Sequence, residues 1–139
     1  MVRVSVAMAV YNGEAYLKEQ LDSVLRQLGK KDELIISDDG STDQTIPIIE
    51  EYKKKDPRIR LIFGQGRGIK QNIANAIAHT KGAYIFLADQ DDVWMPDKVK
   101  RVLAVFREKK CHVVVHDCIV TDAERKQVIY PSFFAYRGC

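Results

Sequence analysis

The chain has 139 residues, the usual length of one domain. Hydrophobic residues make up 46% and charged residues 29% of it, which excludes wholesale disorder, collagen-like repeats and low-complexity tracts. The 22 lysines and arginines exceed the 19 aspartates and glutamates by so little, for a net charge of +3, that no nucleic-acid partner is expected.

Cysteine usage and hydropathy indicate an intracellular, water-soluble protein. The three cysteines show no C-x-x-C spacing, so neither a disulfide scaffold nor a zinc ribbon is implied. No apolar stretch approaches the roughly 18 residues that span a bilayer. Residues 1–10 run into a Tyr-Asn-Gly turn without the small-residue site of a cleaved signal peptide. We therefore expect the protein to be located in the cytoplasm.

Short apolar runs alternate with amphipathic stretches along the chain. The pattern predicts strands at residues 2–10, 33–37, 58–63 and 83–88, and helices at 14–28, 46–55, 70–80 and 96–109. Later strands are expected at 112–116 and 119–121, the first of them in the centre of the sheet. Strands and helices that alternate with short connections predict an α/β fold, with a mostly parallel sheet and helices on both faces. No linker or repeat divides the chain, so residues 1–139 are predicted to form a single domain.

Polar clusters follow each of the first four predicted strands. They are Tyr11-Asn12, the acidic turn at 38–41, the glycine-rich segment 64–68 and the acidic segment 89–92. In open α/β sheets the carboxyl ends of parallel strands form the edge where ligands bind. We therefore expect these four segments to meet at one ligand site.

Asp89 and Asp91 flank one residue and can point to the same side of a turned backbone. Two carboxylates 4 Å apart repel by roughly 4 kcal/mol at an effective dielectric constant of about 20, so such a pair attracts a cation. Mg²⁺ and Mn²⁺ prefer oxygen ligands and commonly join one or two carboxylates to substrate phosphates. The alternative is that these acids only cap the helix predicted to begin at Pro96.

The acidic turn and the glycine-rich segment also have two interpretations each. Asp38 and Asp39 can stabilise a turn, or they can accept hydrogen bonds from the base or the ribose of a ligand. We favour contact with a ligand for Asp39. The G-x-G-x-G pattern ending at Gly68 differs from the dinucleotide-binding motif. Gly68 can nevertheless let the backbone approach a ligand at a helix N-terminus. Cysteines and histidines cluster between residues 111 and 118, and we expect them to be core or loop residues rather than zinc ligands.

Four segments in order resemble family-2 inverting glycosyltransferases of the GT-A fold. They are VSVAMAVYNG at 4–13, ISDDGSTD at 36–43, GIKQN at 68–72 and GAYIFLADQDDVW at 82–94. The resemblance covers nearly the whole chain and corresponds to the N-terminal, nucleotide-sugar-binding portion of these enzymes. The Asp-Gln-Asp-Asp-Val-Trp form is similar to the rhamnosyltransferase-like branch, which takes part in bacterial surface polysaccharide assembly.

The resemblance implies the residues of a donor site. Tyr11 would pack on the nucleotide base, and Asp39 would form a hydrogen bond with it. Asp89 would lie by the ribose and the metal, and Asp91 would ligate the Mg²⁺ or Mn²⁺ at the diphosphate. Position 9 is alanine where relatives often have threonine or proline, so no side-chain hydroxyl is present there. The nucleotide-sugar site implied in full comprises Ala9, Tyr11, Asn12, Asp38, Asp39, Gly68, Asn72, Asp89 and Gln90, with Asp91 and Asp89 as metal ligands.

The resemblance also implies the reaction. A hydroxyl of a saccharide or lipid-linked acceptor would attack the anomeric carbon of a UDP- or dTDP-sugar and invert its configuration. Relatives supply the catalytic base from a segment beyond the length of this chain, so we expect an incomplete enzyme that is inactive alone. Peripheral association with the inner face of the membrane is expected by analogy. The alternatives are a sugar-phosphate nucleotidyltransferase-like enzyme and a non-catalytic nucleotide-sugar-binding fragment.

Overall fold

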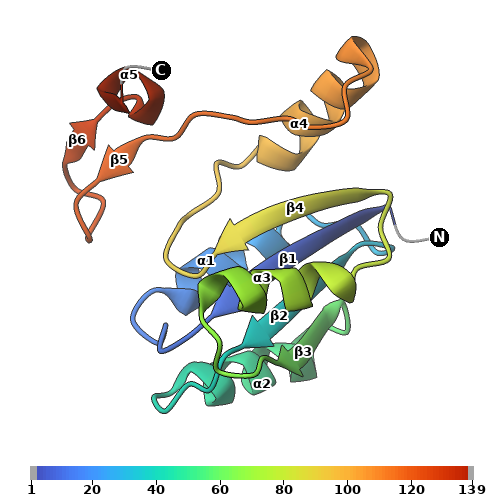
Figure 1. Ribbon diagram of the computed structural model, residues 1–139. Helices are drawn as coiled ribbons and strands as arrows, with labels where there is room; N and C mark the ends of the chain where they lie inside the picture. Colours follow the sequence, from blue (N-terminus) through green and yellow to red (C-terminus); the bar gives the residue numbers. More distant parts are fainter. Residues whose placement is uncertain (1–2, 138–139) are drawn as a thin grey trace. The chain divides into compact units, whose positions relative to one another are not determined.

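The computed structural model describes residues 3–137, and the chain divides after Lys100 into two compact units (Figure 1). The predicted alternation of strands and helices is confirmed, with ends that shift by a few residues. No helix in the described part of the chain combines the length and apolarity needed to cross a bilayer. The first unit contains β1 (Val4–Val10), α1 (Leu17–Leu25), β2 (Glu33–Asp38), α2 (Thr45–Lys55), β3 (Ile59–Phe63), α3 (Ile69–Ala78) and β4 (Tyr84–Asp89), and α4 (Lys98–Lys109) begins at its end.

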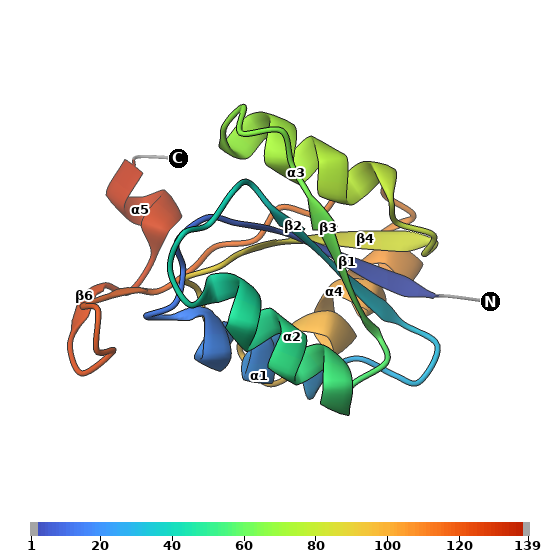
Figure 2. The ribbon, with the colours of Figure 1, turned by 90° about the horizontal axis from the view of Figure 1, so that it is seen from below.

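The sheet of the first unit has the strand order β3-β2-β1-β4, and every neighbouring pair is parallel. Helix α3 covers one face, and α1 and α2 cover the other (Figure 2). Strand β1 is central and buried along all seven residues. The sheet grows from β1 through β2 to β3 and then continues on the other side of β1 with β4. The strand order therefore reverses beside β1, where α/β sheets open a crevice at their carboxyl ends.

Small side chains bring α3 close to the centre of the sheet. Ala7 of β1 and Ala76 of α3 are fully buried and form a core cluster with Ile35 of β2. Ile62 and Ile73 pack against this cluster. Alanine at both positions leaves little side-chain bulk between the helix and the strand. Nearer the N-terminal end of α3, the Nδ2 of Asn72 donates to the carbonyl of Val10 at 3.2 Å and ties the helix to the carboxyl end of β1.

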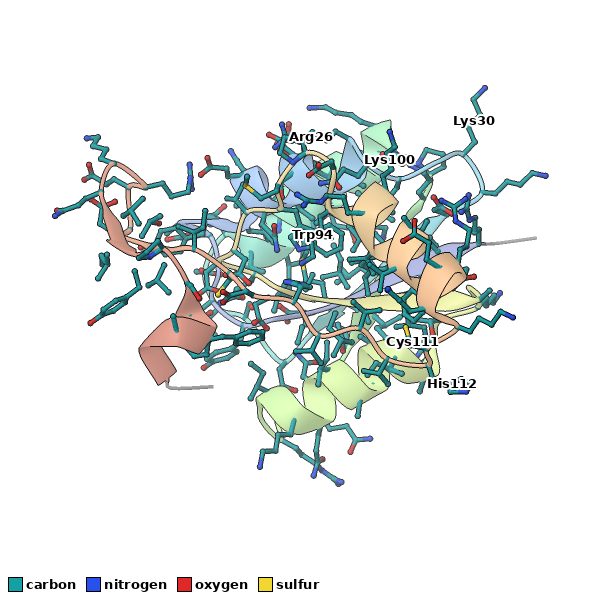
Figure 3. The ribbon with its side chains drawn as sticks, turned by 90° about the horizontal axis from the view of Figure 1, so that it is seen from above. Arg26, Lys30, Trp94, Lys100, Cys111 and His112 are labelled. Carbon is teal, nitrogen blue, oxygen red and sulfur yellow. The ribbon has the colours of Figure 1, made fainter. Side chains whose placement is uncertain are left out.

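Trp94 belongs to the core of the first unit (Figure 3). Its side chain is 3% exposed, and the centre of its ring lies 5.7 Å from that of Phe86 in β4. The Nζ atom of Lys98 lies 4.2 Å from the centre of the Trp94 ring, at cation–π distance. These contacts hold the segment between β4 and α4 against the sheet.

The second unit contains a short hairpin of β5 (Val120–Thr121) and β6 (Val128–Tyr130), followed by α5 (Phe133–Arg137). The prediction of a central strand at 112–116 is wrong, because these residues form no strand and the side chains of Val113 and Val115 are 74% and 76% exposed. A run of valines has high strand propensity, but a strand also needs a neighbour to complete its hydrogen bonds. None of the described strands pairs with this run.

Candidate functional site

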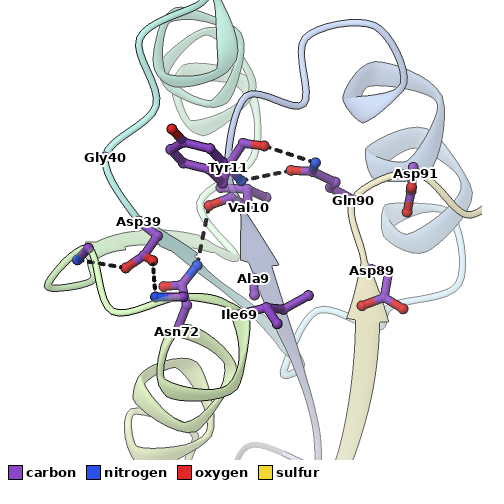
Figure 4. Close-up of a pocket in the computed structure, with 12 residues that line it drawn as sticks. Ala9, Val10, Tyr11, Asp39, Gly40, Ile69, Asn72, Asp89, Gln90 and Asp91 are labelled. Carbon is purple, nitrogen blue, oxygen red and sulfur yellow. Dashed lines mark hydrogen bonds between the residues drawn. The ribbon is translucent and has the colours of Figure 1, made fainter.

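A cavity of about 750 Å³ opens at the carboxyl ends of β1, β2 and β4 (Figure 4). Its walls come from the four segments that follow β1, β2, β3 and β4, so these segments meet at one site. Strand β1 lies between β2 and β4, and it therefore separates the two acidic sides of the cavity. The lining residues are Ala9, Val10, Tyr11, Asp39, Gly40, Gly66, Gly68, Ile69, Asn72, Asp89, Gln90 and Asp91.

Asp39 holds the glycine-rich segment in place. Its Oδ1 accepts a hydrogen bond from the backbone N–H of Gly66 at 2.9 Å, and its Oδ2 accepts one from that of Gly68 at 2.8 Å. Both glycines have positive φ angles, +65° and +87°, a conformation that side chains disfavour. Each carboxylate oxygen has two lone pairs, so Asp39 keeps acceptor capacity for a ligand.

Asn72 presents a buried oxygen without a hydrogen-bond donor. Its side chain is 3% exposed, and its Nδ2 donates to the backbone carbonyls of Ser37 at 2.8 Å and Val10 at 3.2 Å. These two bonds fix the orientation of the amide, because the reverse orientation would bring its oxygen against two carbonyl oxygens. Within the described residues Oδ1 has no hydrogen-bond partner. Buried polar groups are normally paired, so this oxygen is an unpaired acceptor within the wall of the cavity.

Gln90 joins the segment after β4 to the segment after β1. Its Oε1 accepts a hydrogen bond from the backbone N–H of Tyr11 at 2.8 Å, and its Nε2 donates to the carbonyl of the same residue at 3.0 Å. The amide of Gln90 is thus engaged by backbone at both ends (Figure 4). The side chain of Tyr11 is 56% exposed, which leaves its ring available for packing against a ligand.

Asp89 and Asp91 provide the negative charge on the other side of the cavity (Figure 4). Both side chains are exposed. No group of three or more histidine, cysteine or acidic side chains that could hold a metal ion occurs among the described residues. Two carboxylates alone are a poor site for a zinc-type centre. They fit Mg²⁺ or Mn²⁺, which is bound by one or two carboxylates and completes its coordination with water and substrate phosphates.

Asn12 and Asp38 were expected in the site but do not line the cavity. Asp38 is fully buried; its Oδ1 accepts hydrogen bonds from the backbone N–H groups of Gly40 and Ser41 at 2.9 Å each, and its Oδ2 accepts one from the Ser41 hydroxyl. The Oδ1 of Asn12 accepts a hydrogen bond from the backbone N–H of Thr42 at 2.8 Å. Both residues therefore build the turns that carry the lining residues.

Several lining residues escaped the sequence analysis. Val10 and Ile69 are apolar and carry no chemical signal, although Ile69 is 67% exposed at the start of α3. Gly40 and Gly66 lie in segments that the sequence places at the site, but neither was singled out as a site residue; both have positive φ angles. Gln20 does not line the cavity but supports it. This polar residue lies on the apolar side of α1, is fully buried and donates to the carbonyl of Asp89, and a polar residue among apolar ones was the signal in the sequence.

Comparison with known proteins gives consistent matches. The family model "Glycosyl transferase family 2" matches residues 5–137. The dTDP-rhamnosyl transferase RfbG of Shigella flexneri is 36% identical over 114 residues, which cover 76% of this chain and 39% of RfbG. The matched part of the chain spans about 40% of the length of RfbG and of several other curated relatives.

Solved structures agree with these matches. S. aureus TarS 1–349 in complex with UDP has a TM-score of 0.66 and 26% identity, over 86% of this chain and 42% of that one. The mannosyltransferase PcManGT from Pyrobaculum calidifontis, in complex with GDP-Man and Mn²⁺, has a TM-score of 0.69 and 24% identity, over 76% of this chain and 32% of that one. The first unit therefore has the mostly parallel α/β fold of GT-A enzymes.

Proposed function

Because the chain belongs to glycosyl transferase family 2, we propose that it forms the donor-binding part of an enzyme that transfers sugar from a nucleoside diphosphate. The observation that carries this proposal is a single cavity that joins Tyr11 and Asp39 to Asp89 and Asp91. A nucleotide sugar has a flat base with polar edges at one end and a charged diphosphate in its middle. An aromatic ring and acceptor groups suit the base, and paired carboxylates with a cation suit the diphosphate.

The base would lie on the side of the cavity formed by β2 and α3. The ring of Tyr11 is exposed enough to pack on its face, and Asp39 keeps lone pairs that can accept an N–H from its edge. Asn72 lines the same side, and Ala9 adds no polar contact. UDP- and dTDP-sugars are the donors we propose, supported by the UDP bound to TarS and by the donor in the name of RfbG.

The diphosphate would lie near Asp89 and Asp91, with Mg²⁺ or Mn²⁺ between them. When bound, the cation neutralises negative charge that develops on the departing nucleoside diphosphate. Asp91 and Asp89 would hold the cation through their carboxylates. Gln90, between them, keeps this segment attached to the backbone of Tyr11, so the two ends of the donor site are coupled through one side chain.

The proposed reaction is a single displacement with inversion. The acceptor oxygen forms a bond to the anomeric carbon, the bond from that carbon to the diphosphate oxygen breaks, and a carboxylate base takes the hydroxyl proton. We assign the base and the acceptor site to a segment outside these 139 residues, and expect this chain alone to bind donor without transferring sugar. We propose a saccharide or lipid-linked acceptor and a location at the cytoplasmic face of the membrane.

Calorimetric titration of the chain with UDP, with and without Mn²⁺, tests the donor site. We expect Mn²⁺ to strengthen UDP binding and Asp91→Asn to remove that gain. Asp92→Asn is the matched control, because it makes the same change one residue further along, where the side chain does not line the cavity. UDP binding that is absent, or that Mn²⁺ and Asp91→Asn leave unchanged, would refute the proposed donor site.

A further inference from the structure

Three polar side chains of α1 and the turn after it contact the segment between β4 and α4. They are Gln20, Ser23 and Gln27, which we call the α1 polar stripe, and their spacing of three and four residues places them on one side of a helix. Gln20 and Ser23 are fully buried. Buried polar side chains on a helix face that also carries leucines and valines need partners, and here the partners lie far away in the sequence.

The stripe contacts the chain between β4 and α4 at its beginning and in its middle. The Nε2 of Gln20 donates to the backbone carbonyl of Asp89 at 2.7 Å. The Oγ of Ser23 accepts a hydrogen bond from the backbone N–H of Trp94 at 3.0 Å. The two stripe residues also support each other, since the Ser23 hydroxyl lies 2.8 Å from the Oε1 of Gln20.

Gln27 completes the stripe at the other end of the segment. Its Nε2 donates to the backbone carbonyl of Met95 at 2.9 Å, and its Oε1 accepts a hydrogen bond from the backbone N–H of Val99 at 3.1 Å. Four backbone groups between residues 89 and 99 are thus held by side chains of α1 and the turn after it. Because β4 is an edge strand, no described neighbouring strand holds this segment on its outer side.

We propose that the α1 polar stripe is a positioning device that sets Asp89 and Asp91 at the spacing a diphosphate-bound cation requires. This inference rests on the proposed function. Two exposed carboxylates repel each other, and residues 90–97 form no helix or strand that would oppose the repulsion. A backbone already fixed by the stripe keeps the carboxylates together before the cation arrives. Residues that orient metal ligands in this way commonly change metal affinity by about 10- to 100-fold when mutated.

Two serines offer a matched pair of variants for the test. Ser23 and Ser5 are both fully buried, and each accepts a hydrogen bond from a backbone N–H. The Oγ of Ser5 accepts from Gly82 at 2.8 Å and donates to Glu33, at the opposite end of the sheet from the cavity. Ser23→Ala and Ser5→Ala therefore each remove a fully buried hydroxyl that accepts a backbone N–H, and only the first loosens the chain between residues 89 and 99.

Amide hydrogen exchange of the nucleotide-free chain tests the restraint itself. We expect Ser23→Ala to speed exchange at Trp94 and its neighbours between residues 89 and 99 by about tenfold, relative to the rest of the sheet. Ser5→Ala should leave this ratio at its wild-type value. Equal exchange of residues 89–99 in the two variants would overturn the inference, whatever the chain binds.

The metal dependence of UDP binding tests the consequence. We expect the gain in UDP affinity on adding Mn²⁺ to fall about tenfold in Ser23→Ala and in Gln20→Leu, while UDP binding without metal stays unchanged. Ser5→Ala should keep the full gain. A gain that is equal in all variants would overturn the inference. If the wild-type chain shows no Mn²⁺-dependent UDP binding, the proposed function is refuted instead. The exchange experiment then still tests whether the stripe restrains residues 89–99.

Discussion

Replacement of Asp39 by asparagine tests the coupling between the glycine-rich segment and the base side of the cavity. The carboxylate accepts one backbone N–H on each oxygen, from Gly66 at 2.9 Å and Gly68 at 2.8 Å. Asparagine has a single acceptor oxygen, so one of these N–H groups would face an NH₂ group. A hydrogen bond to a charged acceptor contributes about 1.5–3 kcal/mol, and partial exposure of Asp39 favours the lower value.

A loss of about 1.5 kcal/mol corresponds to a fall in Tm of about 6 °C or more for a unit of this size. We also expect UDP affinity to fall at least about tenfold, since the base would lose an acceptor and the wall beside it. Thermal unfolding followed by circular dichroism and calorimetry with UDP measure the two effects. An Asp39→Asn chain with the wild-type Tm would refute the argument that this carboxylate holds the segment.

Asp43 provides the control, because its carboxylate also accepts two backbone N–H groups but does not line the cavity. The donors are Thr45 at 2.9 Å and Glu14 at 3.1 Å. Desolvation raises the pKa of Asp43, but the hydrogen bonds from Thr45 and Glu14 together hold it below its usual value. Asp43→Asn should lower Tm and leave UDP affinity unchanged. Equal losses of UDP affinity in both variants would mean that affinity follows stability rather than contact with the base.

Three further predictions concern stability. The hydrogen bond from Arg58 lowers the pKa of Asp56. The ionised Asp56 carboxylate therefore stabilises the fold above pH about 4, and this contribution is lost as pH falls through the lowered pKa of the folded state. The urea midpoints of wild type and Asp56→Asn should therefore converge in acid. Burial, with the hydrogen bond to Asp22, raises the pKa of Tyr52 to about 12. Wild type should therefore lose stability above pH about 10. Tyr52→Phe should be less stable than wild type at neutral pH but should not show this loss. Gly82→Ala would bring a Cβ to 2.6 Å from a backbone nitrogen of β1, and should cost about 2 kcal/mol in the same urea assay; an unchanged midpoint would contradict the packing.

The placement of Asp39 and Asp38 illustrates how far sequence reasoning reached at the site. Asp38 is the last residue of β2 and Asp39 follows it, and the sequence favoured Asp39 for contact with a ligand. The structure places Asp39 in the cavity wall and buries Asp38 within its own turn. Adjacent residues at the end of a strand point in opposite directions, so two neighbouring acids rarely share one role. Which of the two points into the cavity depends on the register of β2 against β1, which composition does not reveal.

The order of elements and the gathering of polar segments at one edge were determined by the sequence, because periodicity and turn residues act over short distances along the chain. The partners of individual side chains were decided by tertiary structure. Gln20 reaches Asp89, 69 residues away, only because the strand order places β4 beside β1. The valine run at 113–115 failed to form a strand for the same reason. The local propensity of residues favours a backbone conformation, but a hydrogen-bond partner is available only where the tertiary fold places one next to the segment.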